Sequence, residues 1–376
     1  AELQDEINRI ELLQDLNKKA TAAEQLYTKL MRAGRIPYTQ DSTAVFIYFG
    51  VAKSVAWNGD FNRWGENRST TVSAKNIEGT HFWYDTKIFP ADARLDYKVT
   101  LNNAEWILDP GNPYQQWSGF GPNSELRMPG WQPDAHTNAY PDVAKGSMSE
   151  WTAINSGKLG YAVNYAVYQP AGFDEISNMN VIYVTDGQEY SADELGAMVN
   201  VLDNLHNTEE IEPTVAVFVN PIDPGDGESN RRMTEMGSPE YLLFFTEELI
   251  PVIENKYSIS GDSENRAILG TSLGGLNATF FGFSRPDLFK KIGIQAPAFW
   301  YRKEIYNLVK TTEFPDPKIF MTVGTIGDNI KDARLMKTIF EEKGYDFEYL
   351  EVNEGHSWGA WRTQLDEILI YFFGKR

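Results

Sequence analysis

The sequence predicts an α/β protein: a mostly parallel sheet covered by helices, preceded by an N-terminal helix and an immunoglobulin-like β-sandwich. Two observations carry this prediction. From about residue 150 to the end, continuous apolar segments alternate with amphipathic ones, which is typical of buried parallel strands and their connecting helices. Between residues 43 and 110, short alternating segments are separated by Asn, Gly and Asp, which is typical of the strands of a sandwich.

Length, composition and charge limit the classes of function. The chain has 376 residues, 42% of them hydrophobic, which suffices for two packed domains. No apolar run reaches the roughly 20 residues that a membrane span needs. The net charge of −19 argues against nucleic-acid binding, which requires an excess of Lys and Arg. Because the chain has no cysteine, thiol catalysis, disulfides and thiolate metal sites are excluded.

We expect three parts along the chain: residues 1–36, residues 37–131 and residues 132–376. The first part forms one helix over residues 2–33, because an apolar stripe recurs at three- and four-residue steps from Leu3 to Leu30. Such a helix suits either a homodimer contact or the surface of the next domain, and we favour the second. The second part is the sandwich with a packed linker, and the third part is the α/β domain.

One stretch of the sandwich region carries a recognisable pattern. Residues 57–64 read Trp-Asn-Gly-Asp-Phe-Asn-Arg-Trp, which resembles a hairpin of the immunoglobulin-like E-set domains, including glycogen-binding-like carbohydrate modules. The resemblance implies a sugar-stacking platform formed by Trp57, Trp64 and Trp106. The alternative is that these rings fill the core of the sandwich or pack against the next domain, and we favour this alternative.

The sharpest chemical signal is the sequence Gly-Thr-Ser-Leu-Gly at residues 270–274. An apolar segment precedes it and a helical pattern follows it, so we expect Ser272 on the strand–turn–helix of a nucleophile elbow. The flanking glycines let the backbone turn sharply, and the start of the helix favours the negative charge that develops when a serine attacks an ester. We therefore assign Ser272 as the nucleophile of an α/β-hydrolase fold.

A serine hydroxyl needs a base, which in this fold follows the serine on a loop after the last strand. The chain has four histidines. His81 and His136 precede the α/β pattern, and His206 lies in a predicted helix upstream of the serine. Elimination leaves His356, after the apolar segment 348–352, as the general base. Activity should fall when this imidazole is protonated.

A carboxylate should orient the base and should lie between the serine and the histidine in the chain. Asp328 follows the apolar segment 318–323 and is our assignment. Asp332 is the competitor, and Glu354 comes third. The alternative role for Asp328 is the N-cap of the helix that follows it.

Two backbone amides should form the oxyanion hole. The first is the amide of Leu273, directly after the nucleophile. The second should come from the loop after an early central strand, where the chain reads Thr-Asp-Gly-Gln-Glu at residues 185–189. We assign it to Gln188 and expect Gly187 to permit the turn.

The C-terminal region resembles the esterase D and enterochelin-esterase-like family, which also contains the feruloyl and acetyl-xylan esterases. The resemblance rests on residues 186–188, 232–235, 247–254, 270–274, 284–289 and 355–361. It implies a Ser-Asp-His mechanism through an acyl-enzyme, with no metal or organic cofactor. It also implies that Arg232 and Glu235 pair near the site, and that Trp300 and Trp358 either contact the acyl group or pack their loops.

The negative charge and the few basic residues near the proposed site favour a neutral feruloyl (hydroxycinnamoyl) or acetyl ester of a polysaccharide over an anionic siderophore. The siderophore esterase stays an alternative within the same class. A glycan-binding protein that uses the hydrolase fold as a scaffold is the alternative of another class, and the sequence does not separate a hydrolase from an acyltransferase. The start at Ala1 favours a removed export signal, hence a secreted or periplasmic protein, with a cytoplasmic one as the alternative.

Overall fold

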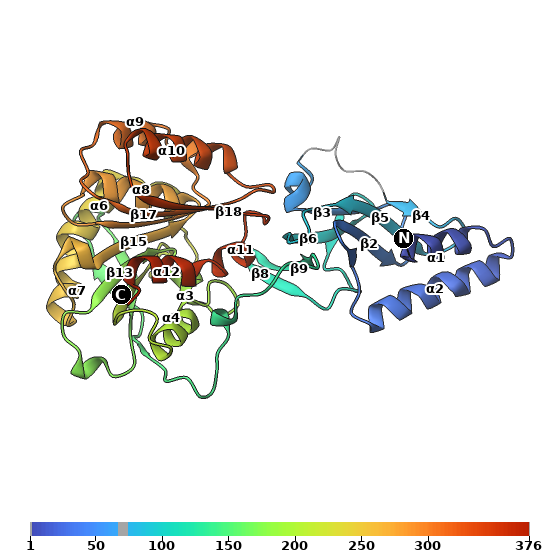
Figure 1. The fold of residues 1–376 in the computed structure, drawn as a ribbon, viewed down its shortest axis with the longest axis horizontal. Helices are drawn as coiled ribbons and strands as arrows, with labels where there is room; N and C mark the ends of the chain where they lie inside the picture. Colours follow the sequence, from blue (N-terminus) through green and yellow to red (C-terminus); the bar gives the residue numbers. More distant parts are fainter. Residues whose placement is uncertain (1, 67–73, 376) are drawn as a thin grey trace. The chain divides into compact units, whose positions relative to one another are not determined.

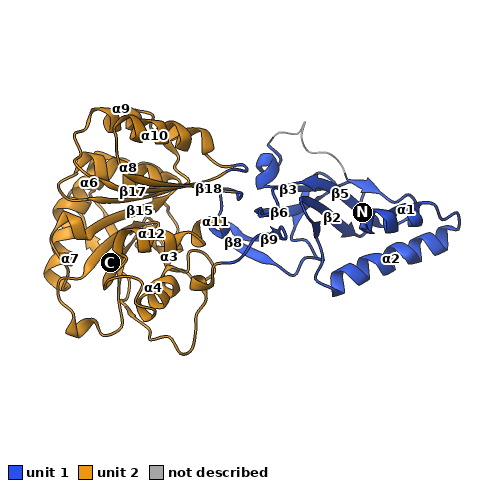
Figure 2. Cartoon of the chain, viewed as in Figure 1, with its two compact units in different colours: residues 1–133, 325–327, 353–359 blue, residues 134–324, 328–352, 360–376 orange. Residues whose placement is uncertain are grey.

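The computed structural model describes residues 2–66 and 74–375 (Figure 1). The chain divides into two compact units, coloured separately in Figure 2. Unit 1 contains residues 1–133 and two short later segments, 325–327 and 353–359. Unit 2 contains the remaining residues from 134 onward. The segment 353–359 carries His356, so the predicted base belongs to the compact unit of the sandwich.

The N-terminal region forms two helices, α1 (Glu2–Glu11) and α2 (Leu16–Arg32), so the prediction of one continuous helix is wrong. Asp15 explains the break. Its carboxylate accepts hydrogen bonds from the amides of Asn17 (3.0 Å) and Lys18 (3.1 Å). This is the N-cap arrangement that satisfies the first amides of a new helix.

Both helices bury their apolar stripes against a sheet of the same unit. Their side chains share a core with a four-stranded antiparallel sheet in the order β1-β2-β5-β4. The strands are β1 (Tyr38–Gln40), β2 (Thr43–Phe49), β4 (Lys75–Asn76) and β5 (Phe82–Ile88). The helices therefore pack on the sheet that follows them in the chain, which is the alternative that we favoured. The homodimer contact stays a prediction.

The second sheet of unit 1 completes the predicted sandwich. Its order is β3-β6-β9-β8, with β7 beside β6. The strands are β3 (Val55–Gly59), β6 (Arg94–Leu101), β7 (Glu105–Ile107), β8 (Gln115–Ser118) and β9 (Gly121–Arg127). Trp57 is 2% exposed and its ring lies 5.8 Å from that of Phe46, so Trp57 fills the core as we favoured. Trp64 and Trp106 instead stack on each other at 6.4 Å.

A nine-stranded sheet forms the centre of unit 2, in the order β10-β12-β14-β13-β15-β16-β17-β18 with β11 beside β12. The strands are β10 (Ser147–Met148), β11 (Thr152–Asn155), β12 (Ala162–Gln169), β13 (Asn180–Thr185), β14 (Thr214–Asn220), β15 (Arg266–Thr271), β16 (Lys291–Gln295), β17 (Lys318–Gly324) and β18 (Phe347–Val352). Strands β13 to β18 pair in parallel, and β12 pairs antiparallel with β14. The mostly parallel sheet confirms the predicted fold class.

Helices cover both faces of this sheet (Figure 1). On one face α8 (Leu273–Ser284), α9 (Glu304–Thr311) and α10 (Ile330–Glu342) pack in sequence, and on the other α4 (Met198–Asn207) packs against α12 (Leu365–Phe373). The shorter helices are α3 (Gly187–Ser191), α5 (Arg232–Glu235), α6 (Pro239–Leu243), α7 (Ile250–Lys256) and α11 (Trp358–Arg362). Apolar side chains of the sheet and of α8 to α10 form one continuous core, which makes a rigid base for the strand ends.

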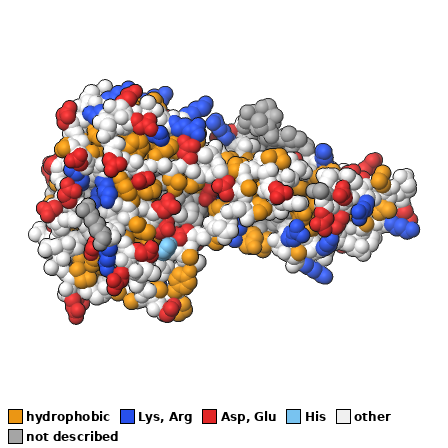
Figure 3. All heavy atoms as spheres, in the orientation of Figure 1, with side chains coloured by type: hydrophobic (Ala, Val, Ile, Leu, Met, Phe, Trp, Pro, Cys, Tyr) orange, Lys and Arg blue, Asp and Glu red, His pale blue; other side chains and the backbone are white. Residues whose placement is uncertain are grey.

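Charged side chains are spread over the surface. Figure 3 shows acidic and basic side chains interspersed over both units on the face in view. Within residues 2–66 and 74–375, the helices are all too short or too polar to cross a membrane.

Candidate active site

The turn at Ser272 has the geometry that a nucleophile elbow requires. Ser272 lies between β15 and α8 with φ 58° and ψ −114°, a backbone conformation that residues other than glycine rarely adopt. A Cβ on Gly270 would lie 2.6 Å from Thr185 Oγ1, so only glycine fits there. The expected strand, turn and helix are therefore all present around the serine.

Hydrogen bonds from the neighbouring strand β16 hold the elbow. The Ser272 amide donates to the Gln295 carbonyl (2.8 Å), and the Ala298 amide donates to the Ser272 carbonyl (2.9 Å). The Gln295 side chain is fixed in turn, because Tyr190 donates to its Oε1 (2.7 Å) and its Nε2 donates to the Trp361 carbonyl (2.9 Å). The serine therefore sits on backbone that is anchored within its own sheet.

The predicted oxyanion loop follows β13. Asp186 has a left-handed backbone (φ 54°), and α3 begins directly after it. A Cβ on Gly187 would lie 2.5 Å from the carbonyl carbon of Phe218, which explains why glycine occupies this turn. Gln188 is the second residue of α3 and Leu273 is the first residue of α8. The amides of a first helical turn have no acceptor within their own helix, so both predicted donors are of the right kind.

The predicted pairing of Arg232 with Glu235 is wrong. Arg232 instead forms a two-pronged ion pair with Asp186, with Nε–Oδ1 at 3.0 Å and Nη2–Oδ2 at 2.9 Å. Glu235 accepts a hydrogen bond from the Tyr161 hydroxyl (2.9 Å), and burial raises its pKa to about 7. Both prongs of the guanidinium match the Asp186 carboxylate, and this match fixes the left-handed residue that opens the predicted oxyanion loop.

The structure separates the candidate acids by what they bind. Asp328 lies four residues after β17 and accepts from the amides of Gly324 (2.7 Å) and Asn329 (2.6 Å). The N-cap residue of α10 is Asn329, so Asp328 does not have the alternative N-cap role. Asp332 lies within α10 and accepts from the Tyr306 hydroxyl (2.7 Å). The third candidate, Glu354, accepts from the indole of Trp131 (3.1 Å) inside unit 1.

His206 has structural surroundings. Thr214 donates its amide to His206 Nε2 (3.1 Å), and burial lowers the pKa of His206 to about 4. A buried, neutral imidazole of this kind supports the elimination that led to His356. His356 itself lies four residues after β18, and Ser272 directly follows β15. Both strand ends, like that of β17, lie at the carboxyl edge of the parallel sheet, where open α/β sheets hold their sites.

A cluster of potential metal ligands lies in unit 2. Asp134, His136 and Asp366 bring their ligand atoms within 4.8 Å of one another. His136 Nδ1 is 3.0 Å from Asp134 Oδ1 and 3.3 Å from Asp366 Oδ2. Burial lowers the pKa of His136, but the surrounding carboxylates outweigh this and raise it. The raised pKa favours the protonated imidazole, which can pair with these carboxylates. The absence of a metal or cofactor from the reaction stays a prediction.

The two tryptophans that the sequence proposed as substrate contacts differ in exposure. Trp300 is 54% exposed and lies two residues after Ala298, whose amide binds the Ser272 carbonyl. Trp358 is 2% exposed, which favours the packing alternative for it. Trp300 therefore stays the candidate for contact with an aromatic acyl group, and this role is a prediction.

A G-x-S-x-G elbow on a mostly parallel, doubly covered sheet is typical of ester hydrolases. The chain belongs to the putative esterase family, whose model matches residues 156–372, more than half of the chain. It is therefore a carboxylic ester hydrolase.

Several known proteins are similar to the chain. An uncharacterized protein of Bacillus subtilis, YbbA, is 24% identical over 255 residues, which are 61% of this chain and 98% of that protein. An endo-1,4-beta-xylanase/feruloyl esterase of Xylanibacter ruminicola is 25% identical over 325 residues, 81% of this chain but only 42% of that protein. The structure of the ferric enterobactin esterase of Salmonella typhimurium superposes with a TM-score of 0.72 at 17% identity, covering 88% of this chain and 93% of that one.

Proposed function

We propose that the chain hydrolyses a feruloyl (hydroxycinnamoyl) or acetyl ester of a polysaccharide through an acyl-enzyme. The observation that carries the proposal is the elbow, where Ser272 is held in a strained conformation at the start of α8. Strain of this size persists only when the surrounding structure imposes it, and it exposes a serine hydroxyl for attack.

In the proposed reaction, Ser272 Oγ attacks the ester carbonyl carbon while His356 takes the hydroxyl proton. The imidazolium then gives that proton to the departing alcohol, which leaves the acyl group on the serine. Water attacks this acyl-enzyme by the same route, so the acid is released and the hydroxyl is restored. The amides of Leu273 and Gln188 bind the oxyanion in both halves of the reaction.

We propose Asp328 as the acid that orients His356. Two backbone amides fix its carboxylate, which supports a role that depends on orientation. Its competitors have other engagements, Asp332 with Tyr306 and Glu354 with Trp131. An acid in this role keeps the imidazole in the tautomer that can accept the serine proton.

Four basic residues lie near the proposed site in the sequence: Arg231, Arg232, Arg302 and Lys303. The first two are paired with carboxylates, which supports a neutral ester. Arg232 is bound to Asp186, and Arg231 is bound to Asp223 and lies over the ring of Tyr161 at 3.7 Å. Cations already paired in this way offer little to an anionic catecholate siderophore. The exposed ring of Trp300 favours an aromatic acyl group over acetyl. The similarity to a xylanase/feruloyl esterase agrees with this choice, and the enterobactin esterases keep the siderophore ester as the alternative substrate.

A polysaccharide ester lies outside the cell, so the proposal includes a secreted or periplasmic location. It also keeps the division into residues 1–36, 37–131 and 132–376 as domains.

Glycan binding by the sandwich is a second candidate function, favoured by the stacked pair of Trp64 and Trp106, of which Trp106 is 45% exposed. Retention on insoluble xylan that is lost in Trp106→Ala, but kept in Ser272→Ala, would establish it.

The test is a substrate panel of methyl ferulate, an acetylated sugar and a catecholate ester with wild type and Ser272→Ala. We expect hydrolysis of the ferulate by wild type and none by the variant. Turnover of the catecholate ester in preference to the ferulate would replace the substrate proposal, and full activity in Ser272→Ala would overturn the mechanism. Adding a polyol acceptor and analysing the products separates a hydrolase from an acyltransferase.

A further inference from the structure

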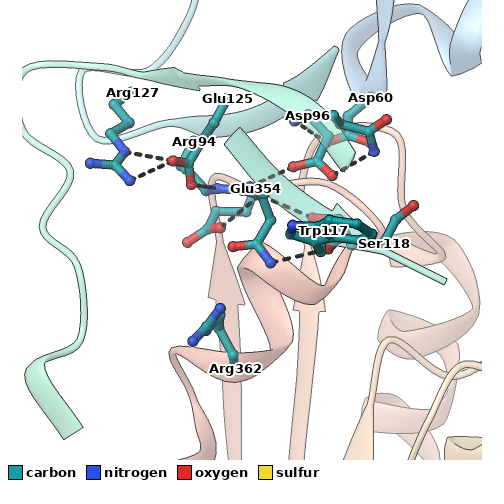
Figure 4. Close-up of polar contacts among 12 residues, drawn as sticks. Asp60, Arg94, Asp96, Trp117, Ser118, Glu125, Arg127, Glu354 and Arg362 are labelled. Carbon is teal, nitrogen blue, oxygen red and sulfur yellow. Dashed lines mark hydrogen bonds and ion pairs between the residues drawn. The ribbon is translucent and has the colours of Figure 1, made fainter. Parts of the chain in front are cut away.

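Unit 1 contains a buried arginine for which ester hydrolysis supplies no direct role. Arg94, at the start of β6, is 0% exposed. Its guanidinium donates from Nε to Glu125 (2.6 Å) and from Nη2 to Asp96 (2.5 Å), as Figure 4 shows. A buried guanidinium with paired carboxylates is costly to desolvate, and apolar residues of similar volume usually stabilise a core at least as well. What such a cluster provides is fixed geometry.

The third side of the guanidinium faces the segment 353–359. Arg94 Nη1 donates to Ser357 Oγ (3.0 Å) and lies 3.9 Å from Glu354 Oε2. The Arg94 amide donates to the Asn353 carbonyl (3.2 Å), and Arg94 forms a parallel β-bridge with Glu354. Both backbone and side chain of one residue therefore hold the segment on each side of His356.

Glycines let this segment approach closely. A Cβ on Gly355 would overlap the carboxyl group of Asp60, and a Cβ on Gly359 would overlap the guanidinium of Arg94. Asp60 belongs to the same cluster, because its Oδ2 accepts from the Asp96 amide (2.7 Å). The two glycines bracket His356, so the segment lies against the cluster on both sides of the imidazole-bearing residue.

A second segment of unit 1 strengthens this attachment. Ile326 packs against the core of the sandwich, and its amide donates to the Glu354 carbonyl (3.2 Å). The hydroxyl of Thr325 donates to Asn353 Oδ1 (2.8 Å), and Asn353 Nδ2 donates to Asp92 (2.8 Å). The segment 353–359 is therefore tied to the strand β6 region through both its ends and through a neighbouring loop.

We propose that Arg94 is a positioning residue for the catalytic base: it fixes the segment 353–359 so that His356 is presented for proton transfer. This inference rests on the proposed function, because it needs His356 to be the base. It makes the sandwich part of the catalytic apparatus rather than an accessory module. Lysine cannot replace the arginine, because its three N–H groups radiate from one nitrogen and do not match the planar, spread donors of the guanidinium fork.

The first measurement is hydrogen–deuterium exchange of the full chain, which reads the segment without any substrate. In Arg94→Lys, exchange in the peptide covering residues 353–359 should become faster. Arg266→Lys is the matched control, because Arg266 is similarly buried and is paired with Glu254. Arg266 lies in unit 2, and it is the first residue of β15, whereas Ser272 follows the last residue of that strand. Unchanged exchange of the segment in Arg94→Lys, or an equal change in Arg266→Lys, would overturn the proposal.

The second measurement is kinetic. Arg94→Lys should lower kcat for the ester by about 10- to 100-fold with little change in KM, because displacement of a reacting group by an ångström costs on this order. The acid limb of its pH–rate profile should also move, since the imidazole changes surroundings. Loss of thermal stability alone, with kcat and the pH profile unchanged, would contradict the positioning role.

A milder variant covers the case in which Arg94→Lys folds poorly. Ser357→Ala removes one acceptor of the guanidinium and should lower kcat in the same direction. Where Arg94→Lys does fold, the two losses in the double variant should be less than multiplicative, because both act through one contact. Fully multiplicative losses would overturn the proposal. Faster exchange of the segment in Arg94→Lys, together with a wild type that hydrolyses none of the esters, would instead support the attachment and refute the proposed function.

Discussion

The two loops that carry the proposed nucleophile and base are supported in different ways. Ser272 is held by its own strand, by the helix that it begins, and by the adjacent β16. His356 lies in a segment whose contacts come from β6 and other distant parts of unit 1. Arg94 and Ser357, for example, are 263 residues apart in the chain. Local support leaves a motif in the sequence, whereas distant support leaves none. The difference explains why the elbow could be recognised and the role proposed for the sandwich could not.

The largest expected effect tests the roles themselves. Ser272→Ala and His356→Ala should each lower kcat by about 10⁴- to 10⁶-fold, because the nucleophile and its base act as a unit. The double variant should be little worse than either single one. Circular dichroism and thermal unfolding should show wild-type folding for all three. Losses that multiply would mean that the two residues do not share a step.

The next effect separates the candidate acids. Asp328→Asn should lower kcat on the order of 10⁴-fold, because the amide favours the wrong imidazole tautomer. Asp332→Asn is the matched control and should keep most activity, since Asp332 binds Tyr306. The measurement is kcat on a p-nitrophenyl ester. The reverse order of losses would move the assignment to Asp332.

A smaller effect tests the ion pair that supports the loop after β13, next to the proposed nucleophile. Arg232→Gln removes the two-pronged pair with Asp186 and should lower kcat by roughly 10²-fold through the displaced oxyanion loop. Glu235→Gln should have little effect, because Glu235 binds Tyr161 instead. Steady-state kinetics of both variants decide this. Equal losses in the two variants would indicate that Arg232 and Glu235 act together, as the family resemblance suggested.

The smallest effect concerns how the stability of the protein depends on pH through Glu354, in the segment that carries the proposed base. Burial raises the pKa of Glu354 to about 7, against the opposing charge of Arg94. A carboxyl group whose pKa is raised by folding contributes its full stabilisation only when the pH is below its pKa in the unfolded chain. This contribution is lost as the pH rises through the folded-state pKa of about 7. Glu354→Gln, which mimics the protonated group, should therefore stabilise the protein relative to wild type above pH 7. Thermal unfolding at several pH values measures this, and a difference that does not change with pH would contradict it.

The sequence predicted the sheet, the sandwich, the turn at Ser272 and the packing of Trp57, because periodicity and turn residues express these features locally. It missed the break before α2, although the signal was present in Asp15, a strong N-cap residue. The family resemblance implied that Arg232 pairs with Glu235, whereas Asp186, which Arg232 binds, is brought near only by folding. The contacts of Arg94 depend wholly on tertiary structure and had no local signal.

The most direct test of the account is the rate at which a fluorophosphonate labels the full chain, followed by intact mass and peptide mapping. This reagent reacts with a serine whose base is in place. We predict one adduct, on Ser272, at a rate lowered about 10- to 100-fold in Arg94→Lys and unchanged in Arg266→Lys. No adduct in wild type, or an adduct that persists in Ser272→Ala, would contradict the account.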